Sequence, residues 1–222
     1  MEMSELIAYS APESQVAEAY RTVYSGLQSA AGDALFKTIA VTSALPGAGK
    51  SVVAANLAVV AAQAGKKILL VDCNFGHPMQ HTIFHLDNRG ISDCIMANGD
   101  WTAFCQPTGQ ERLDLLAMGS VAASVLSTER LQQMLDDMQV SYDLIVLDTS
   151  SVLAGIGALS VAAAADGVLL VVASGEERPQ DARLVKKRLL QAKAHIVGCV
   201  LNRAQVGKGY DDYYCRQGGN RQ

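Results

Sequence analysis

Short apolar segments alternate with helix-like segments along most of the chain, and this alternation restricts the fold more than any other feature. The strand-like segments are continuously apolar, as expected of strands that are buried on both faces. They cover residues 38–42, 67–72, 113–117, 144–148, 168–172 and 196–201. Helices are predicted between them at 51–64, 128–138, 158–165 and 180–192. The order predicts an α/β fold with a doubly wound, mostly parallel sheet flanked by helices.

The two ends of the chain differ from this pattern. A further helix is predicted at about 13–30, beginning after Pro12. The chain of 222 residues is long enough for one well-filled core, so residues 1–206 are predicted to form a single domain. Residues 207–222 are polar and glycine-rich, which is typical of a flexible tail.

A glycine-containing loop joins the first strand to the helix that follows, in the sequence TIAVTSALPGAGKS. Backbone amides can surround a phosphate only where side chains do not intrude, and Gly47 and Gly49 meet that need. Lys50 would reach the β- and γ-phosphates, and the Ser51 hydroxyl would bind Mg²⁺. Ala44 stands where the full phosphate-loop pattern has its first glycine. The predicted ligands are ATP and Mg²⁺, and the residues predicted to bind nucleotide are Pro46, Gly47, Ala48, Gly49, Lys50, Ser51, Val52, Asn202 and Arg203. Asn202 and Arg203 follow the last strand, and from this topology we expect them to contact the base.

Two aspartates end apolar strands, Asp72 in KKILLVDCN and Asp148 in DLIVLDTS. In an open parallel sheet, ligands bind beyond the carboxyl ends of the strands, so both carboxylates are expected near the phosphate loop. Asp148 is interpreted as the acid that holds the hydration shell of Mg²⁺, as in phosphate-loop enzymes. The predicted metal ligands are therefore Ser51, Asp72 and Asp148. The alternative is that either aspartate only caps a loop or a helix.

These motifs, in this order, resemble the bacterial tyrosine kinases that control capsule and exopolysaccharide export, in a phosphate-loop fold related to MinD and ParA. TSALPGAGKS resembles the family's first motif, ILLVDCNFGHP the second and LIVLDTSS the third; AAADGVLLVV and VGCVLNRA also have counterparts there. The resemblance implies an ATP-dependent kinase with Lys50, Asp72 and Asp148 as catalytic residues. EAYRT resembles the family segment that packs subunits into a ring, which implies ring contacts through Glu18 and Arg21.

The family ends in a tyrosine cluster that neighbouring subunits phosphorylate, and Tyr210, Tyr213 and Tyr214 occupy the corresponding place. An acceptor tyrosine must reach a neighbour's site, and the glycines of the tail favour such reach. Each added phosphate would bring nearly two negative charges beside Asp211 and Asp212, which would weaken a ring by repulsion. The alternative is a frayed end whose tyrosines are there by chance.

Three departures from the family pattern concern catalysis more than binding. Asn74 replaces the second acid of the second motif, Gly76 stands at its arginine position, and Ser150 and Ser151 replace two prolines after Asp148. Asparagine keeps an oxygen for metal-bound water but lacks the charge. These changes predict secure ATP binding and weakened phosphoryl transfer.

Composition excludes several other classes of protein. The net charge of −4 does not favour a nucleic-acid partner, and the N-terminus resembles no export signal. Five scattered cysteines predict neither a disulfide framework nor a zinc site. His77, His81 and His85 recur at helical spacing, which is a weak indication of a metal site because no carboxylate accompanies them. The basic residues Arg183, Lys186, Lys187 and Arg188 are interpreted as a solvated helix face.

Two functions fit these motifs. The first is a stand-alone cytoplasmic tyrosine autokinase, for which the resemblance implies a membrane-embedded activator that recruits it to the inner face of the cell membrane, and a tyrosine phosphatase. The second is an ATPase switch of the MinD/ParA type. That class carries an extra lysine early in its loop, whereas residues 44–47 contain none.

Overall fold

The computed structural model describes residues 5–32, 36–120, 128–154 and 157–204. Their strands form one sheet in the order β3-β4-β2-β5-β1-β6-β7. All neighbouring pairs are parallel except β3 and β4. The strands are β1 (Thr38–Ser43), β2 (Ile68–Cys73), β3 (Gln106–Pro107), β4 (Leu113–Leu116), β5 (Leu144–Thr149), β6 (Gly167–Ala173) and β7 (Ile196–Asn202). The predicted α/β fold with a mostly parallel sheet is confirmed.

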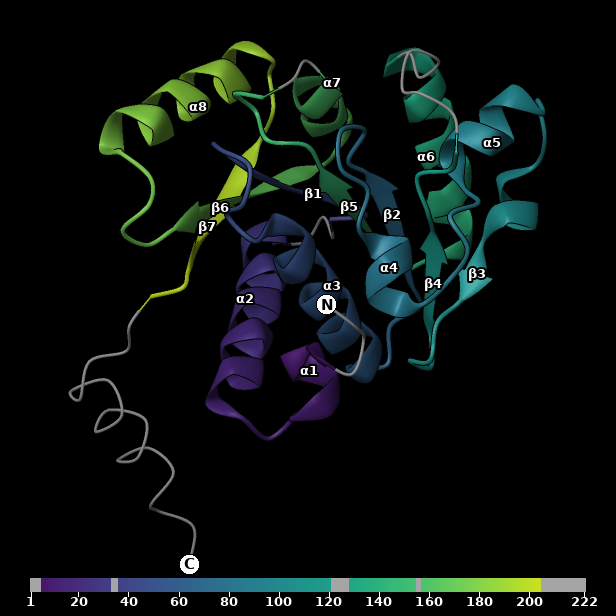
Figure 1. Cartoon of the computed structure of the whole chain (residues 1–222), viewed down its shortest axis with the longest axis horizontal. Helices are drawn as coiled ribbons and strands as arrows, with labels where there is room; N and C mark the ends of the chain where they lie inside the picture. The colour runs from purple at the N-terminus through teal and green to yellow at the C-terminus, as the bar shows by residue number, and fades with distance from the viewer. Residues whose placement is uncertain (1–4, 33–35, 121–127, 155–156, 205–222) are drawn as a thin grey trace, which may run out of the picture.

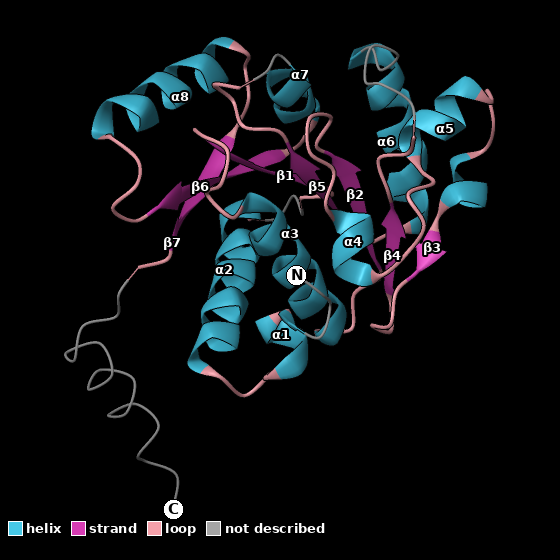
Figure 2. Cartoon of the chain, in the orientation of Figure 1, coloured by secondary structure: helices cyan, strands magenta, loops and turns pink. Residues whose placement is uncertain are grey.

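Helices cover both faces of this sheet (Figures 1 and 2). On one face lie α1 (Ile7–Ser10), α2 (Gln15–Ala31), α3 (Lys50–Gln63) and α4 (Gln80–Phe84). On the other lie α5 (Ile91–Met96), α6 (Thr128–Ser141), α7 (Gly157–Ala164) and α8 (Pro179–Gln191). A short 3₁₀ helix, η2 (Trp101–Phe104), follows α5.

Strand residues divide between the two cores with the period of two that a strand requires. Ile39 and Val41 of β1 pack with α2 and α3, whereas Ala40 packs with the helices of the opposite face. The central strands are buried along their whole length, which explains why their sequences are apolar without alternation.

The N-terminal helix α2 begins two residues later than predicted. Ser14 precedes it, and the Ser14 hydroxyl accepts a hydrogen bond from the Ala17 amide at 3.2 Å. A serine cap satisfies an amide that the helix itself leaves unpaired, so Ser14 and not Pro12 sets the start.

Five short elements were not predicted: α1, α4, α5, η2 and β3. The two-residue strand β3 lies antiparallel at the edge of the sheet. The predicted tail, including Tyr210, Tyr213 and Tyr214, lies outside the described residues.

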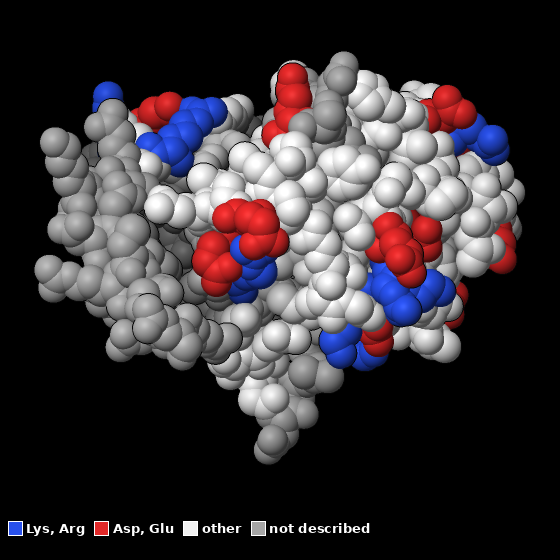
Figure 3. All heavy atoms as spheres, turned by 90° about the horizontal axis from the view of Figure 1, so that it is seen from below, with Lys and Arg blue, Asp and Glu red and all other residues white. Residues whose placement is uncertain are grey.

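Within the described ranges, no helix combines the length and the apolar character that crossing a membrane requires. On the face shown in Figure 3, basic and acidic side chains lie beside one another in small groups separated by uncharged surface.

Candidate functional site

The carboxyl ends of three neighbouring strands bring the predicted site together. Asp72 of β2 lies opposite Asp148 of β5, and Asp148 lies opposite Val41 of β1. Two residues beyond Val41, β1 ends and the chain enters the loop that leads to α3. The parallel register therefore places both acids beside the loop, as the sequence predicted.

The loop has the backbone geometry that its glycines allow. Gly47 has φ 86° and Gly49 has φ 87°, in the left-handed region that favours glycine. Gly49 is followed directly by α3, so the unpaired amides at the start of that helix lie at the end of the loop. The departure at Ala44 is accommodated because its methyl group is buried in an apolar cluster.

Asp148 is fully buried at the end of β5. Its Oδ2 accepts a hydrogen bond from Nε2 of Gln80 at 2.8 Å, whereas its Oδ1 has no hydrogen-bond partner among the described residues. Burial and the negative charge of Asp72 raise the pKa of Asp148, while Gln80, the Ser51 hydroxyl and Lys50 oppose that rise. A buried oxygen without a partner beside a serine hydroxyl suits a hard cation that takes oxygen ligands, so these residues fit Mg²⁺.

Asp72 is also fully buried, but both of its carboxylate oxygens accept hydrogen bonds from backbone amides. Oδ1 accepts from the Asn74 amide at 3.0 Å, and Oδ2 accepts from the amides of Met79 and Gln80 at 2.9 and 3.0 Å. Burial raises the pKa of Asp72, and the three amides and Lys50 oppose that rise. Asp72 thus shapes the turn after β2 and lies next to Asp148 at the same time.

Lys50 supplies the positive charge of the site. It is the first residue of α3 and only 8% exposed, and its charge lowers the pKa of both carboxyl groups. Cys73 follows Asp72 and is fully buried, and burial together with both acids raises the pKa of its thiol. The Cys73 thiol is therefore held in its neutral form.

Sequence reasoning missed Gln80, which connects the three motifs. It is fully buried, and its Nε2 donates to Asp148 Oδ2 and to the Ser51 carbonyl oxygen at 3.0 Å. Its backbone amide donates to Asp72. A polar residue two positions after Pro78 carries no recognisable pattern, so only the fold reveals this role.

Two of the departures from the family pattern meet in space. The Ser150 hydroxyl donates to Oδ1 of Asn74 at 3.0 Å, and Nδ2 of Asn74 donates to the His77 carbonyl at 2.8 Å. Asn74 is 4% exposed. Both polar ends of its amide therefore bind protein groups, and the oxygen predicted to face metal-bound water accepts from Ser150.

The side chains of Asn202 and Arg203, at the end of β7 and just after it, contact the phosphate loop. Nδ2 of Asn202 donates to the Ala48 carbonyl at 2.9 Å, and Nη2 of Arg203 donates to the Gly47 carbonyl at 2.8 Å. The predicted site residues within the described ranges thus gather at one edge of the sheet.

Comparison with known proteins now identifies the family. Residues 39–213 match the model of the CobQ/CobB/MinD/ParA nucleotide binding domain. The tyrosine-protein kinase YwqD of Bacillus subtilis is 34% identical over 91% of this chain and 87% of its own length. The chain belongs to the bacterial tyrosine kinases.

Solved structures of the family have the same fold. The chimerical protein CapA2B2 is 31% identical, with a TM-score of 0.86 over 91% of both chains. The kinase domain of the Escherichia coli tyrosine kinase ETK is 28% identical, with a TM-score of 0.83 over 91% of this chain and 82% of that domain.

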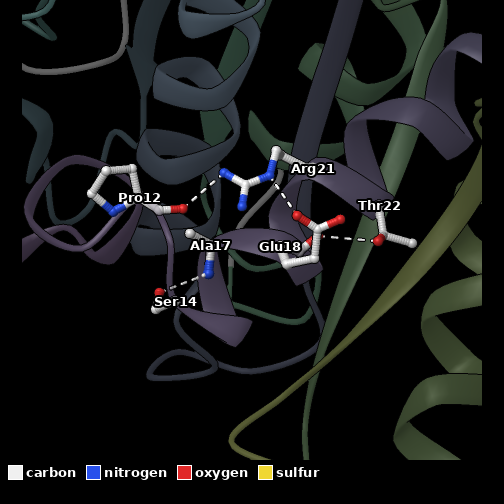
Figure 4. A network of polar contacts seen from close by, with 6 residues as sticks. All are labelled: Pro12, Ser14, Ala17, Glu18, Arg21 and Thr22. Carbon is white, nitrogen blue, oxygen red and sulfur yellow. Dashed lines mark hydrogen bonds and ion pairs between the residues drawn. The ribbon is translucent and has the colours of Figure 1, made fainter. Parts of the chain in front are cut away.

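The segment predicted to pack subunits together makes polar contacts within α2 and with the residues just before it (Figure 4). Nε of Arg21 lies 2.6 Å from Oε2 of Glu18, and Nη1 of Arg21 donates to the Pro12 carbonyl at 2.8 Å. Tyr24, three residues after Arg21, is buried within the subunit. Glu18 is exposed and Arg21 is half-buried, and their ion pair lies on the surface of the helix.

The three histidines do not share a helix face. Only His81 lies within α4, whereas His77 precedes it and His85 ends it in a left-handed conformation with φ 54°. Among the described residues, no group of three or more His, Cys, Asp or Glu side chains could hold a metal ion. Mg²⁺ commonly uses one or two carboxylates, water and substrate phosphates instead.

Proposed function

We propose that this chain is an ATP- and Mg²⁺-dependent protein tyrosine kinase that phosphorylates Tyr210, Tyr213 and Tyr214 of neighbouring copies. The observation that carries the proposal is the buried, unpartnered Oδ1 of Asp148, which lies beside Ser51 and Lys50 at the end of the phosphate loop. Buried carboxylate oxygens are expensive to leave unpaired, so a site of this kind is built to receive a ligand.

The chain's own groups would hold the triphosphate. The amides of Gly47 to Val52 and the start of α3 attract negative charge, and Lys50 adds a full positive charge at the same place. The Ser51 hydroxyl would bind Mg²⁺ directly, and Asp148 would hold one of its water ligands. Bound Mg²⁺ would supply positive charge against the phosphate oxygens.

Asp72 is the group proposed to accept the proton of the attacking tyrosine. Its raised pKa makes it a stronger base than an ordinary aspartate. Within the part of the chain that the structure describes, one amide donates to Oδ1, so that oxygen keeps a second direction in which to accept a hydrogen bond.

The family resemblance supports the remaining parts of the proposal. The acceptor tyrosines would enter a neighbouring subunit within a ring that uses Glu18 and Arg21. A membrane-embedded activator would recruit the kinase from the cytoplasm to the inner face of the cell membrane, and a tyrosine phosphatase would reverse the reaction. Phosphorylation would regulate capsule or exopolysaccharide synthesis and export. The mixed surface charges of Figure 3 form no single-signed field of the kind that attracts nucleic acid to a face.

The test is incubation with labelled ATP and Mg²⁺, with and without the cytoplasmic tail of a candidate activator. Label is expected on the tail tyrosines, and it should disappear in Lys50→Ala and in the triple variant Tyr210→Phe, Tyr213→Phe, Tyr214→Phe. Lys186→Ala, in an exposed lysine of α8, and Tyr9→Phe, in an exposed tyrosine, are matched controls that should keep the label. Label that persists in the triple variant would exclude the proposed acceptors.

A second function has one observation in its favour. Asn74 lacks the charge of the family's acid, and both ends of its amide are bound by protein groups. This favours a weakened, regulatory kinase or an ATPase switch of the MinD/ParA type. Steady ATP hydrolysis without tyrosine label under any activator would support that function.

A further inference from the structure

Asn202, the last residue of β7, and Arg203, which follows it, donate hydrogen bonds to the phosphate loop. Asn202 and Arg203 are 154 and 156 residues away in sequence from the loop residues that they contact. Each donates a side-chain hydrogen bond to a loop carbonyl, Asn202 to Ala48 and Arg203 to Gly47. Two consecutive peptide groups of the loop are therefore fixed by one short segment.

The geometry of the peptide bond turns these contacts into an orientation of the amides. In a trans peptide, the carbonyl of one residue and the amide of the next point in opposite directions. No cis peptide occurs among the described residues. Because the Gly47 and Ala48 carbonyls point toward β7, the amides of Ala48 and Gly49 point away from it. Within the described ranges, those two amides have no hydrogen-bond acceptor in the protein.

The two side chains are themselves held in place. Nη1 of Arg203 lies 2.6 Å from Oε1 of Glu176, which belongs to the loop after β6. Oδ1 of Asn202 accepts from the Arg203 amide at 2.9 Å, so both ends of the Asn202 amide are bound. Arg203 has φ 57°, which turns the chain sharply after β7.

Gly49 completes this arrangement. A Cβ atom at Gly49 would meet Nδ2 of Asn202, in addition to being strained by the positive φ. The glycine therefore serves two needs, the left-handed backbone and the close approach of Asn202.

We propose that Asn202 and Arg203 are positioning residues that orient the peptide groups of the phosphate loop, so that the amides of Ala48 and Gly49 face the phosphates before nucleotide arrives. This role differs from the base contact that topology alone suggested for them. It rests on the proposed function only in assuming that the loop binds phosphate. Preorganised amides bind an anion without the cost of ordering the loop.

The test compares ligands with and without a base. Dissociation constants of Asn202→Ala and Arg203→Ala are measured for ADP, GDP and inorganic tripolyphosphate in the presence of Mg²⁺, with the last two measured by competition against labelled ADP. Each variant is expected to weaken all three ligands by the same factor, about five- to tenfold, as the loss of one hydrogen bond implies. The ratio of ADP to GDP affinity should stay as in the wild type.

Further variants connect the effect to the loop. Glu176→Gln, at a residue whose carboxylate pairs with Arg203, should weaken the same ligands by a smaller factor and add nothing to Arg203→Ala. Arg183→Ala, in an exposed arginine of α8, is the matched control and should bind as the wild type does. Circular dichroism and thermal unfolding check that each variant is folded, and the exposed Arg203 is the safer of the two positions.

Two other outcomes are distinct. Loss of ADP binding with unchanged tripolyphosphate binding, a changed ratio of ADP to GDP, or no effect at all would overturn the positioning role. A wild-type protein that binds none of the three ligands would instead overturn the proposed function.

Discussion

At the scale of single residues, the site contains two buried carboxylates and a single buried amide that connects them. Asp72 and Asp148 lie opposite each other on neighbouring strands, and Gln80 donates to both, through its backbone to the first and through its side chain to the second. Removing a donor from a buried carboxylate leaves that group unsatisfied, which costs more than the hydrogen bond contributes when it is present.

Gln80→Met tests the cost of removing this donor. The variant keeps the size of the side chain but removes the hydrogen bonds to Asp148 and to the Ser51 carbonyl. We expect the free energy of unfolding at pH 8 to fall by about 1–3 kcal/mol. The loss should be smaller at pH 5, where a protonated Asp148 no longer needs a donor.

Urea unfolding at the two pH values measures the difference. Gln63→Met is the matched control, since Gln63 also donates from Nε2 to a carbonyl, that of Ala8, and makes no hydrogen bond to a carboxylate within the described ranges. An equal loss for Gln80→Met at pH 5 and pH 8 would show that its effect does not come from Asp148.

Asn74→Asp restores the acid of the family pattern. Oδ1 can still accept from Ser150, while the hydrogen bond to the His77 carbonyl is lost and a third buried carboxylate is added. We expect Mg²⁺ to bind about tenfold more tightly in the presence of ADP and tyrosine phosphorylation to accelerate. In the absence of Mg²⁺, the free energy of unfolding at pH 8 should fall by about 1–3 kcal/mol.

Magnesium titration of the ADP complex and unfolding by urea measure the two effects. Asn88→Asp is the matched control, because the Asn88 side chain, like that of Asn74, both donates and accepts a hydrogen bond, in this case with the backbone of Gly119. If Asn74→Asp weakens Mg²⁺ binding, the lost charge is not what limits this site.

At the scale of elements, α2 presents Glu18 and Arg21 as a preformed ion pair on its surface (Figure 4). The double exchange Glu18→Arg with Arg21→Glu keeps a pair at the same helical spacing but reverses its direction. Exposed pairs of this kind contribute about 0.5 kcal/mol or less, so the stability of the subunit should change little. In the proposed ring a neighbouring subunit would meet reversed charges, and we expect that assembly to dissociate.

Light scattering after size exclusion measures the assembly, and thermal unfolding checks the subunit. Lys186→Glu in α8 is a control that reverses a charge on a different helix. An assembly that survives the exchange in α2 would show that Glu18 and Arg21 do not form the contact.

At the scale of the whole molecule, the sequence predicted the sheet and the phosphate loop because both depend on local patterns. Strands buried on both faces can be recognised from their continuous apolar sequences, and a parallel sheet then brings their carboxyl ends together. Elements of two to six residues, such as β3 and α4, have no period long enough to be recognised. Gln80 and the contact between Asn74 and Ser150 depend on which strands are neighbours, so no local pattern could predict them. The same reason explains why Asn202 was placed near the base and not against the loop.

Burial of two acids also makes the stability of the whole molecule depend on pH. Burial and Asp72 raise the pKa of Asp148 in the folded protein from its ordinary value of 3.8 to about 7. The folded state therefore holds a proton that the unfolded state has already lost. This contribution to stability is fully present below a pH of about 4 and is lost as the pH rises through about 7. At neutral pH and above, the buried charge of Asp148 therefore lowers the free energy of unfolding of the ligand-free protein.

Asp148→Asn removes this dependence. At pH 8, without nucleotide, the variant is expected to be more stable than the wild type by about 2–4 kcal/mol, because an amide carries no charge to bury. The difference should shrink toward zero at pH 4. With Mg²⁺ and ADP at a thousandfold excess over its dissociation constant the order should reverse, since the wild type gains about 4 kcal/mol and the variant gains little. Urea unfolding at pH 4, 6 and 8, with and without Mg²⁺ and ADP, measures all three differences.

Parallel pH profiles of the two proteins would mean that Asp148 is not the group whose burial controls the profile. The expected crossing would show that the same carboxylate destabilises the empty protein and stabilises the liganded one.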